Sequence, residues 1–88
     1  PICCQSVGLI ARALELNGIA TTLTSWSAGI TQRVKPPRAT YTRLNRGATL
    51  GQPGDAPQQR RVLEATLALL ALDAPLDPVR LDERVDGQ

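Results

Sequence analysis

The chain has 88 residues, enough for one small domain, and its formal charge of +2 comes from ten basic and eight acidic residues. The basic residues are scattered without forming a run, which argues against a nucleic-acid partner. No histidine is present, and two cysteines cannot complete a four-ligand zinc site. We therefore expect no metal and no other cofactor.

The composition predicts a small core, because Trp26 and Tyr41 are the only aromatic residues. Trp26, in a small polar segment, either faces a partner or packs against the helices. We expect additional stability from a homo-oligomer, a larger complex, or further sequence of a longer chain. There is no signal-peptide pattern and no apolar run of about 20 residues, so we expect a cytoplasmic protein with reduced thiols and no membrane partner.

The first predicted element is a helix over residues 6–16, whose apolar side chains recur with the helical period of 3.6. Residues 1–2 are expected to be the end of a β-strand. Asn17–Gly18 predicts the end of the helix, and residues 19–23 form a short β-branched run typical of a strand. Helix, glycine and strand in this order indicate the second half of a βαβ unit whose first strand is truncated.

The middle of the chain predicts one helical turn over residues 30–34, which ends at the double proline Pro36–Pro37. Residues 38–44 have the alternating pattern of a strand. A loop with three glycines follows over residues 45–54.

Asp55 is a good N-cap for the strongest predicted helix, residues 56–72, with Pro57 in its first turn. Gln58 stands three residues after the cap, as in a capping box. Prolines in the tail, residues 73–88, exclude a regular helix there, so we expect an extended or disordered segment. The predicted fold is a small three-layer-like α/β domain over residues 1–72, with two main helices, a short, mostly parallel sheet, and a truncated first strand.

Cys3 and Cys4 are the only residues with obvious redox or nucleophilic chemistry. They stand just before the first predicted helix, where exposed amides and the helix dipole favour a thiolate. Neighbouring α-carbons lie about 3.8 Å apart, below the usual disulfide range of about 4.4 to 6.8 Å, so a mixed disulfide with a protein or small-molecule thiol is easier than a bond between the two. Because strand side chains alternate, one sulfur is expected to be exposed and the other buried. The alternative is that both are small buried hydrophobes.

Two further groups of residues are candidates for function. Ser6 belongs to the candidate catalytic group with the two cysteines, although a capping role is the alternative. The glycine-rich loop offers backbone amides to a small anion at Arg46, Gly47, Thr49 and Gly51. It lacks the Gly-Lys-Ser/Thr ending of a phosphate loop, and a plain connecting loop is the alternative.

Residues 1–15, Pro-Ile-Cys-Cys-Gln-Ser-Val-Gly-Leu-Ile-Ala-Arg-Ala-Leu-Glu, carry a family resemblance, as do residues 18–21. They resemble the selenoprotein B-type subunits of the glycine, sarcosine, betaine and D-proline reductases, especially the short, selenium-free bacterial relatives. Later segments resemble the same relatives, so that the resemblance covers roughly residues 1–72. These segments are residues 36–39, 47–55 and 59–61.

The resemblance implies an α/β fold with a thiol or selenol at a strand-to-helix turn, and a reductase chemistry that passes through a dithiol and a disulfide. Cys3 matches the cysteine of the relatives' Pro-x-Cys-x-Gln-Ser stretch, and Cys4 has no matched role. The relatives' spaced cysteine cluster is absent, because Ser6 stands three residues after Cys3. Two hypotheses follow: a thiol-dependent oxidoreductase with Cys3 as the redox nucleophile, or a non-catalytic assembly or small-anion-binding module that keeps the fold without the chemistry.

Overall fold

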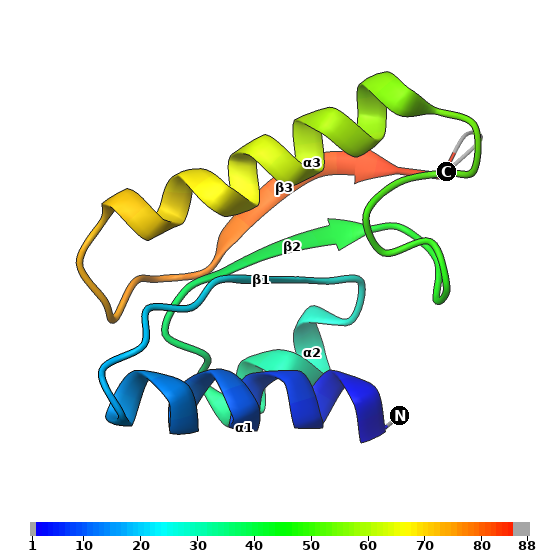
Figure 1. The fold of residues 1–88 in the computed structure, drawn as a ribbon. Helices are drawn as coiled ribbons and strands as arrows, with labels where there is room; N and C mark the ends of the chain where they lie inside the picture. The colour runs from blue at the N-terminus through cyan, green and yellow to red at the C-terminus, as the bar shows by residue number, and fades with distance from the viewer. Residues whose placement is uncertain (1, 86–88) are drawn as a thin grey trace.

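Helices cover both faces of a three-stranded parallel sheet (Figure 1). The computed structural model describes residues 2–85 of the chain. The strands lie side by side in chain order and are β1 (Leu23–Ser25), β2 (Ala39–Arg43) and β3 (Val79–Arg84). The helical elements are α1 (Ile2–Leu16), α2 (Ala28–Thr31), the 3-10 turn η1 (Gln32–Val34), α3 (Ala56–Ala68) and the 3-10 turn η2 (Leu69–Ala71). With α1 and α2 on one face and α3 on the other, the expected three-layer α/β fold with a parallel sheet is confirmed.

The first helix begins at Ile2, so the predicted start at residue 6 is wrong, as is the strand end expected at Ile2. Pro1 lies outside the described residues. Cys4, Gly8 and Ala11 are the buried residues of α1, and their spacing of four and three extends one helical stripe back into the first turn. The predicted helix end is confirmed: Gly18 has a φ of +81°, and its amide donates to the carbonyl of Glu15.

The first strand begins at Leu23 and not at residue 19. Ile19 is half exposed, and the amide of Thr21 donates to the carboxylate of Glu15 in α1 instead of to a neighbouring strand. The amide of Thr21, which a longer strand would need for pairing, is therefore already bonded to the end of α1. The predicted helical turn near residues 30–34 is confirmed by α2 and η1, and the predicted second strand by β2.

Alternate residues of β2 face the two helical layers. Ala39 and Tyr41 pack in one cluster with Ala11 of α1. Thr40 faces α3 instead, where its hydroxyl oxygen lies 2.6 Å from that of Thr66. The layer on the α3 side of the sheet is thus partly polar, and Thr40 and Thr66 pair with each other there.

The last helix begins at the predicted cap, since a carboxylate oxygen of Asp55 accepts a hydrogen bond of 3.1 Å from the amide of Gln58. The reciprocal half of the capping box is absent. The side-chain oxygen of Gln58 accepts instead from the amide of Gln52, at 2.7 Å, because the loop folds back over the helix start. The regular helix ends at Ala68 and η2 continues it, close to the predicted range.

The predicted extended or disordered tail contributes a strand to the sheet. Residues 79–84 form β3 and pair with β2 in parallel, while the connection from α3 is held by a hydrogen bond from the amide of Leu76 to the carbonyl of Pro37. Arg61 of α3 also donates two hydrogen bonds to Glu83. Residues 79–84 therefore belong to the same folded unit as the preceding elements.

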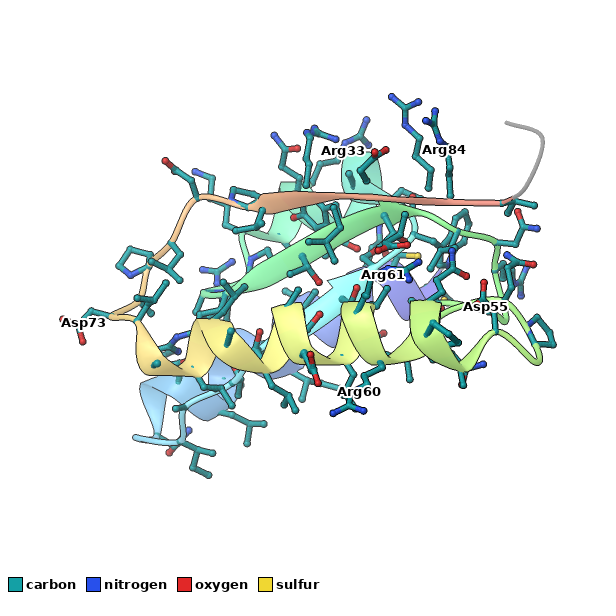
Figure 2. The ribbon with its side chains drawn as sticks, turned by 90° about the horizontal axis from the view of Figure 1, so that it is seen from above. Arg33, Asp55, Arg60, Arg61, Asp73 and Arg84 are labelled. Atoms are coloured by element: carbon teal, nitrogen blue, oxygen red, sulfur yellow. The ribbon has the colours of Figure 1, made fainter. Side chains whose placement is uncertain are left out.

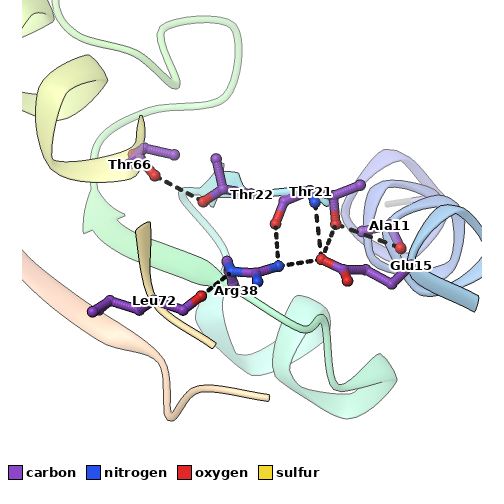
Figure 3. A network of polar contacts seen from close by, with 7 residues as sticks. All are labelled: Ala11, Glu15, Thr21, Thr22, Arg38, Thr66 and Leu72. Carbon is purple, nitrogen blue, oxygen red and sulfur yellow. Dashed lines mark hydrogen bonds and ion pairs between the residues drawn. The ribbon is translucent and has the colours of Figure 1, made fainter. Parts of the chain in front are cut away.

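A buried ion pair ties the layers together at the amino-terminal end of β2 (Figure 3). The guanidinium of Arg38 donates to the carboxylate of Glu15, to the carbonyl of Thr21 at 3.4 Å and to the carbonyl of Leu72 at 3.0 Å. These partners come from the end of α1, the connection to β1 and the end of η2. One side chain therefore joins three segments that are distant in sequence.

Candidate thiol site

A cavity of about 180 Å³ lies beside the first turn of α1 and the carboxyl end of β1. In parallel α/β sheets, binding sites usually lie outside the carboxyl ends of the strands. The cavity joins the two cysteines to Thr49 of the glycine-rich loop, two candidate regions that are about 45 residues apart in the sequence. The lining residues are Cys3, Cys4, Val7, Thr24, Ser25, Trp26 and Thr49.

Cys3 is exposed and Cys4 is buried, as expected, but for a different reason. Both cysteines lie in a helix, where neighbouring side chains point about 100° apart, and not in a strand with alternating faces. Their sulfur atoms are 3.9 Å apart, too far for a disulfide bond and close enough for a thiol hydrogen bond.

Burial raises the pKa of the Cys4 thiol, and the contact with Cys3 acts in the same direction. Cys4 therefore keeps its proton at neutral pH and can donate it in the hydrogen bond to the Cys3 sulfur.

Hydrogen bonds fix the cysteine-bearing turn against the sheet. The Thr31 hydroxyl donates to the backbone carbonyl of Cys4 at 2.9 Å, and its oxygen lies 2.8 Å from the hydroxyl of Ser25 in β1. The Ser25 hydroxyl in turn accepts from the amide of Ser27 at 3.1 Å. Because these residues are buried or half-buried, the network holds the first turn of α1 in one position relative to the carboxyl end of β1.

Ser6 does not line this cavity. It is half-buried within α1, four residues after the first residue of the helix, so the alternative capping role is wrong. Its place beside the cysteines in sequence does not bring its hydroxyl into the cavity.

The loop predicted to bind an anion is only partly brought to the site. Thr49 lines the cavity, whereas Arg46 and Gly47 are exposed and do not. The amides of Ala48 and Gly51 already donate within the loop, to the carbonyls of Asn45 and Ala48. Gly51 itself is packed so closely against Gln59 that an added Cβ would lie 2.7 Å from the Gln59 side chain. The amides of Ala48 and Gly51 thus stabilise turns within the loop.

Trp26 is the main residue of the site whose role the sequence left open. It is half-buried and lines the cavity together with Thr24 and Ser25, which directly precede it. Trp26 directly follows β1, and residues that follow parallel strands gather at one edge of the sheet. The predicted strand ended at residue 23, so the sequence did not place Trp26 at this edge.

The site can support chemistry at sulfur and contains no ready metal-binding set. Within residues 2–85, no group of three or more His, Cys, Asp or Glu side chains could hold a metal ion. None of the helices in this range is long and apolar enough to cross a bilayer.

In comparisons with known proteins, the chain matches no family model, no curated protein and no solved structure.

Proposed function

We propose that the chain is a thiol-dependent oxidoreductase-like protein whose redox nucleophile is Cys3. The observation that carries this proposal is the position of the exposed Cys3 in the first turn of α1, on a cavity at the carboxyl end of β1, with the buried Cys4 sulfur 3.9 Å away. The first turn of α1 contains no acidic residue that would oppose a thiolate. The resemblance to selenoprotein B-type reductase subunits implies the same role for Cys3.

The proposed step is thiol–disulfide exchange. The Cys3 thiolate attacks one sulfur of a disulfide substrate, the substrate's S–S bond breaks, and the leaving sulfur departs as a thiolate that takes a proton from water. Cys3 is then held in a mixed disulfide. A second thiol, deprotonated, attacks the substrate-derived sulfur, forms a new disulfide with it and releases Cys3 as a thiolate.

The second thiol comes from another molecule in this scheme. Cys4 is adjacent to Cys3 in a helical turn, and a disulfide between neighbours would need backbone distortion that helical geometry opposes. Burial also raises the pKa of Cys4, so little of it is thiolate at neutral pH. Since this exchange needs a pool of free thiols, we propose a cytoplasmic setting.

The test is the reaction of the folded protein with glutathione disulfide, followed by intact-mass and peptide mass spectrometry. At pH 7, we expect the mixed disulfide to form faster at Cys3 of the folded protein than at a cysteine of the same chain unfolded in urea. Cys3→Ala should abolish the product, and the matched variant Cys4→Ala should retain it. Trp26 provides a second readout, because this single tryptophan lines the same cavity and its fluorescence should change on adduct formation.

Two results would contradict the proposal. One is a reaction at Cys3 that is no faster in the folded protein than in the unfolded chain. The other is exchange that persists in Cys3→Ala. If Cys3→Ala also kept its oligomeric state and partner binding, the non-catalytic module would be the better description.

We also propose that the chain associates with itself through α3. Leu63 and Leu67 of α3 and Leu70 of η2 are each at least two-fifths exposed and follow the spacing i, i+4 and i+7, so they form one apolar stripe along α3 and η2. Light scattering on a size-exclusion column should show a dimer or larger species for the wild type. Leu67→Glu should shift it towards the monomer. Glu64→Gln is the control, because Glu64 lies next to Leu63 in sequence but outside the stripe, and it should not change the oligomeric state.

A further inference from the structure

The face of β2 and β3 opposite α3 contains a second cavity, separate from the thiol site. Its volume is about 390 Å³, and it shares no lining residue with the thiol cavity. α1 packs against β1, α2 and η1, and forms no substantial contact with β3, so the β3 end of this face is open. The cavity is lined by Tyr41, Thr42, Arg43, Arg80, Leu81, Asp82, Glu83 and Arg84.

The strand register brings an aromatic hydroxyl and three guanidinium groups to this face. Tyr41 is opposite Arg80, and Arg43 is opposite Arg84. Paired residues of neighbouring parallel strands project to the same face, so these four side chains line one side of the sheet. We call them the arginine face.

Tyr41 is the strongest indication that a ligand belongs here, although it also lines a neighbouring cavity of about 330 Å³. The residue is only 2 % exposed, and its hydroxyl has no hydrogen-bond partner within residues 2–85. A buried hydroxyl without a partner is unfavourable by roughly 1 to 3 kcal/mol, so such groups are rare unless something else satisfies them. Burial raises the pKa of Tyr41, and the positive charge of Arg80 lowers it. The effect of Arg80 indicates that its guanidinium lies close to the hydroxyl.

Among residues 2–85, the charges of the arginine face are only weakly paired. Within residues 2–85, Arg43 and Arg80 form no ion pair, and Arg84 has only a long contact of 3.8 Å with the exposed Asp82. The arginines elsewhere that do form pairs each meet a glutamate: Arg38 with Glu15, Arg60 with Glu64, and Arg61 with Glu83. Three guanidinium groups on one open face repel one another and attract an anion.

We infer that the arginine face binds the phosphate group of a small phosphorylated molecule, with Tyr41 donating a hydrogen bond to a phosphate oxygen and Arg80 and Arg43 holding the charge. Guanidinium groups match phosphate oxygens in pairs, and a doubly charged phosphate balances more of this positive charge than a carboxylate does. The volume of the cavity is in the usual range for small-molecule sites.

Inorganic pyrophosphate is a suitable probe, and the chain contains two internal reporters. Tyr41 is the only tyrosine and belongs to the arginine face. Trp26 is the only tryptophan and lines the thiol cavity. In an NMR titration at constant ionic strength, pyrophosphate should shift the ring signals of Tyr41 with saturation and leave the indole signal of Trp26 unchanged. Sodium chloride at matched ionic strength should shift neither.

Arginine variants separate a specific site from a general effect of charge. Arg80→Gln should weaken pyrophosphate binding about tenfold or more, because it removes a charge-assisted hydrogen bond. Arg60→Gln is the matched control with the same loss of charge, since Arg60 lies on α3, far across the molecule from Arg84 (Figure 2). Asp82→Asn removes a nearby negative charge and should tighten binding.

Tyr41→Phe tests the hydroxyl itself. Since the hydroxyl has no protein partner within the described range, its removal should leave the free energy of unfolding unchanged or raise it, while pyrophosphate binding weakens. The inference is overturned if Tyr41 does not respond to millimolar pyrophosphate, if Arg60→Gln weakens binding as much as Arg80→Gln, or if Trp26 responds first. Unchanged affinity in Tyr41→Phe would also overturn the assigned role of the hydroxyl. None of these outcomes depends on the reactivity of Cys3.

Discussion

Arg38 is a charged side chain that is almost entirely removed from solvent. Its side chain is 8 % exposed, and that of its partner Glu15 is 21 % exposed. Burial of a charge is tolerable only where an opposite charge and hydrogen-bond acceptors replace water. Here the carboxylate and the backbone carbonyls of Thr21 and Leu72 do so. The pair therefore specifies how three segments meet.

Replacement of Arg38 by alanine should lower the free energy of unfolding by about 1.5 to 3 kcal/mol, the usual contribution of hydrogen bonds to a charged group. The substitution leaves Glu15 without its counter-charge and two carbonyls without a donor. Urea denaturation followed by circular dichroism measures the effect. Arg60→Ala is the control, because its pair with Glu64 is exposed on α3 and its loss should change little. Equal effects of the two substitutions would contradict a structural role of the buried pair.

Stability should fall in acid. Hydrogen bonds from the Thr21 amide and the nearby Arg38 lower the pKa of Glu15, and the hydrogen bonds from Arg61 lower that of Glu83. The unfolded chain then binds more protons than the folded one, so the stabilisation is complete above the ordinary glutamate pKa of 4.5 and is lost as the pH falls through the lowered values.

The measurement is the urea midpoint between pH 7 and pH 2.5. The midpoint should be nearly constant above pH 5.5 and decrease below about pH 4.5, the range where unperturbed glutamates titrate. Glu15→Gln and Glu83→Gln should each flatten the decrease, since each removes one of the groups responsible. A midpoint that rises as the pH falls would contradict the assignment.

At the scale of elements, α1 lies against η1 through a glycine. A Cβ added at Gly8 would overlap a methyl group of Val34, so only a glycine allows the two segments to approach this closely. Alanine is ordinarily a better helix former than glycine by about 1 kcal/mol. The structure thus gives up helix propensity at Gly8 for close packing of α1 on η1.

Gly8→Ala should therefore destabilise the protein, by about 1 to 3 kcal/mol, despite the better helix propensity of alanine. Gly8→Ala combined with Val34→Ala should be more stable than Gly8→Ala alone, because the shorter side chain makes room for the new methyl group. Thermal unfolding of the four proteins in this cycle measures the coupling. If Gly8→Ala were stabilising, the close approach of α1 and η1 would be wrong.

At the scale of the whole molecule, the sheet is completed by the segment that follows the last helix. β3 covers one side of β2 and supplies Glu83 to Arg61 of α3. It also provides Arg80 and Arg84, two of the four residues of the arginine face. Without β3, β2 would become an edge strand and both faces of the molecule would lose a part of their cover.

A chain truncated after Leu72 should consequently lose cooperative unfolding. We expect a broad thermal transition by circular dichroism and weak dispersion of amide signals in NMR spectra, compared with the sharp transition of the full chain. The truncation removes residues 79–84 and the Leu76 contact to Pro37. Retention of a sharp transition at a similar temperature would show that residues 2–72 fold independently.

By itself the sequence determined the features that depend on local preferences. Asp55 caps a helix because its side chain reaches the amide of Gln58, and Gly18 ends one because glycine accepts a positive φ. The alternation of helical and β-branched segments likewise predicted a parallel α/β sheet, which the structure confirms.

Only the tertiary structure decided the features that depend on contacts between distant residues. The first turn of α1 is helical because Cys4 finds a buried place near Ser25 and Thr31, and residues 79–84 are a strand because β2 offers an open edge. In the same way, the meeting of Cys3 with Thr49 follows from the order and direction of the strands and not from any local pattern. Such contacts join segments tens of residues apart, and hydrophobic periodicity, which reports only which side of one segment is buried, contains no information about the partner.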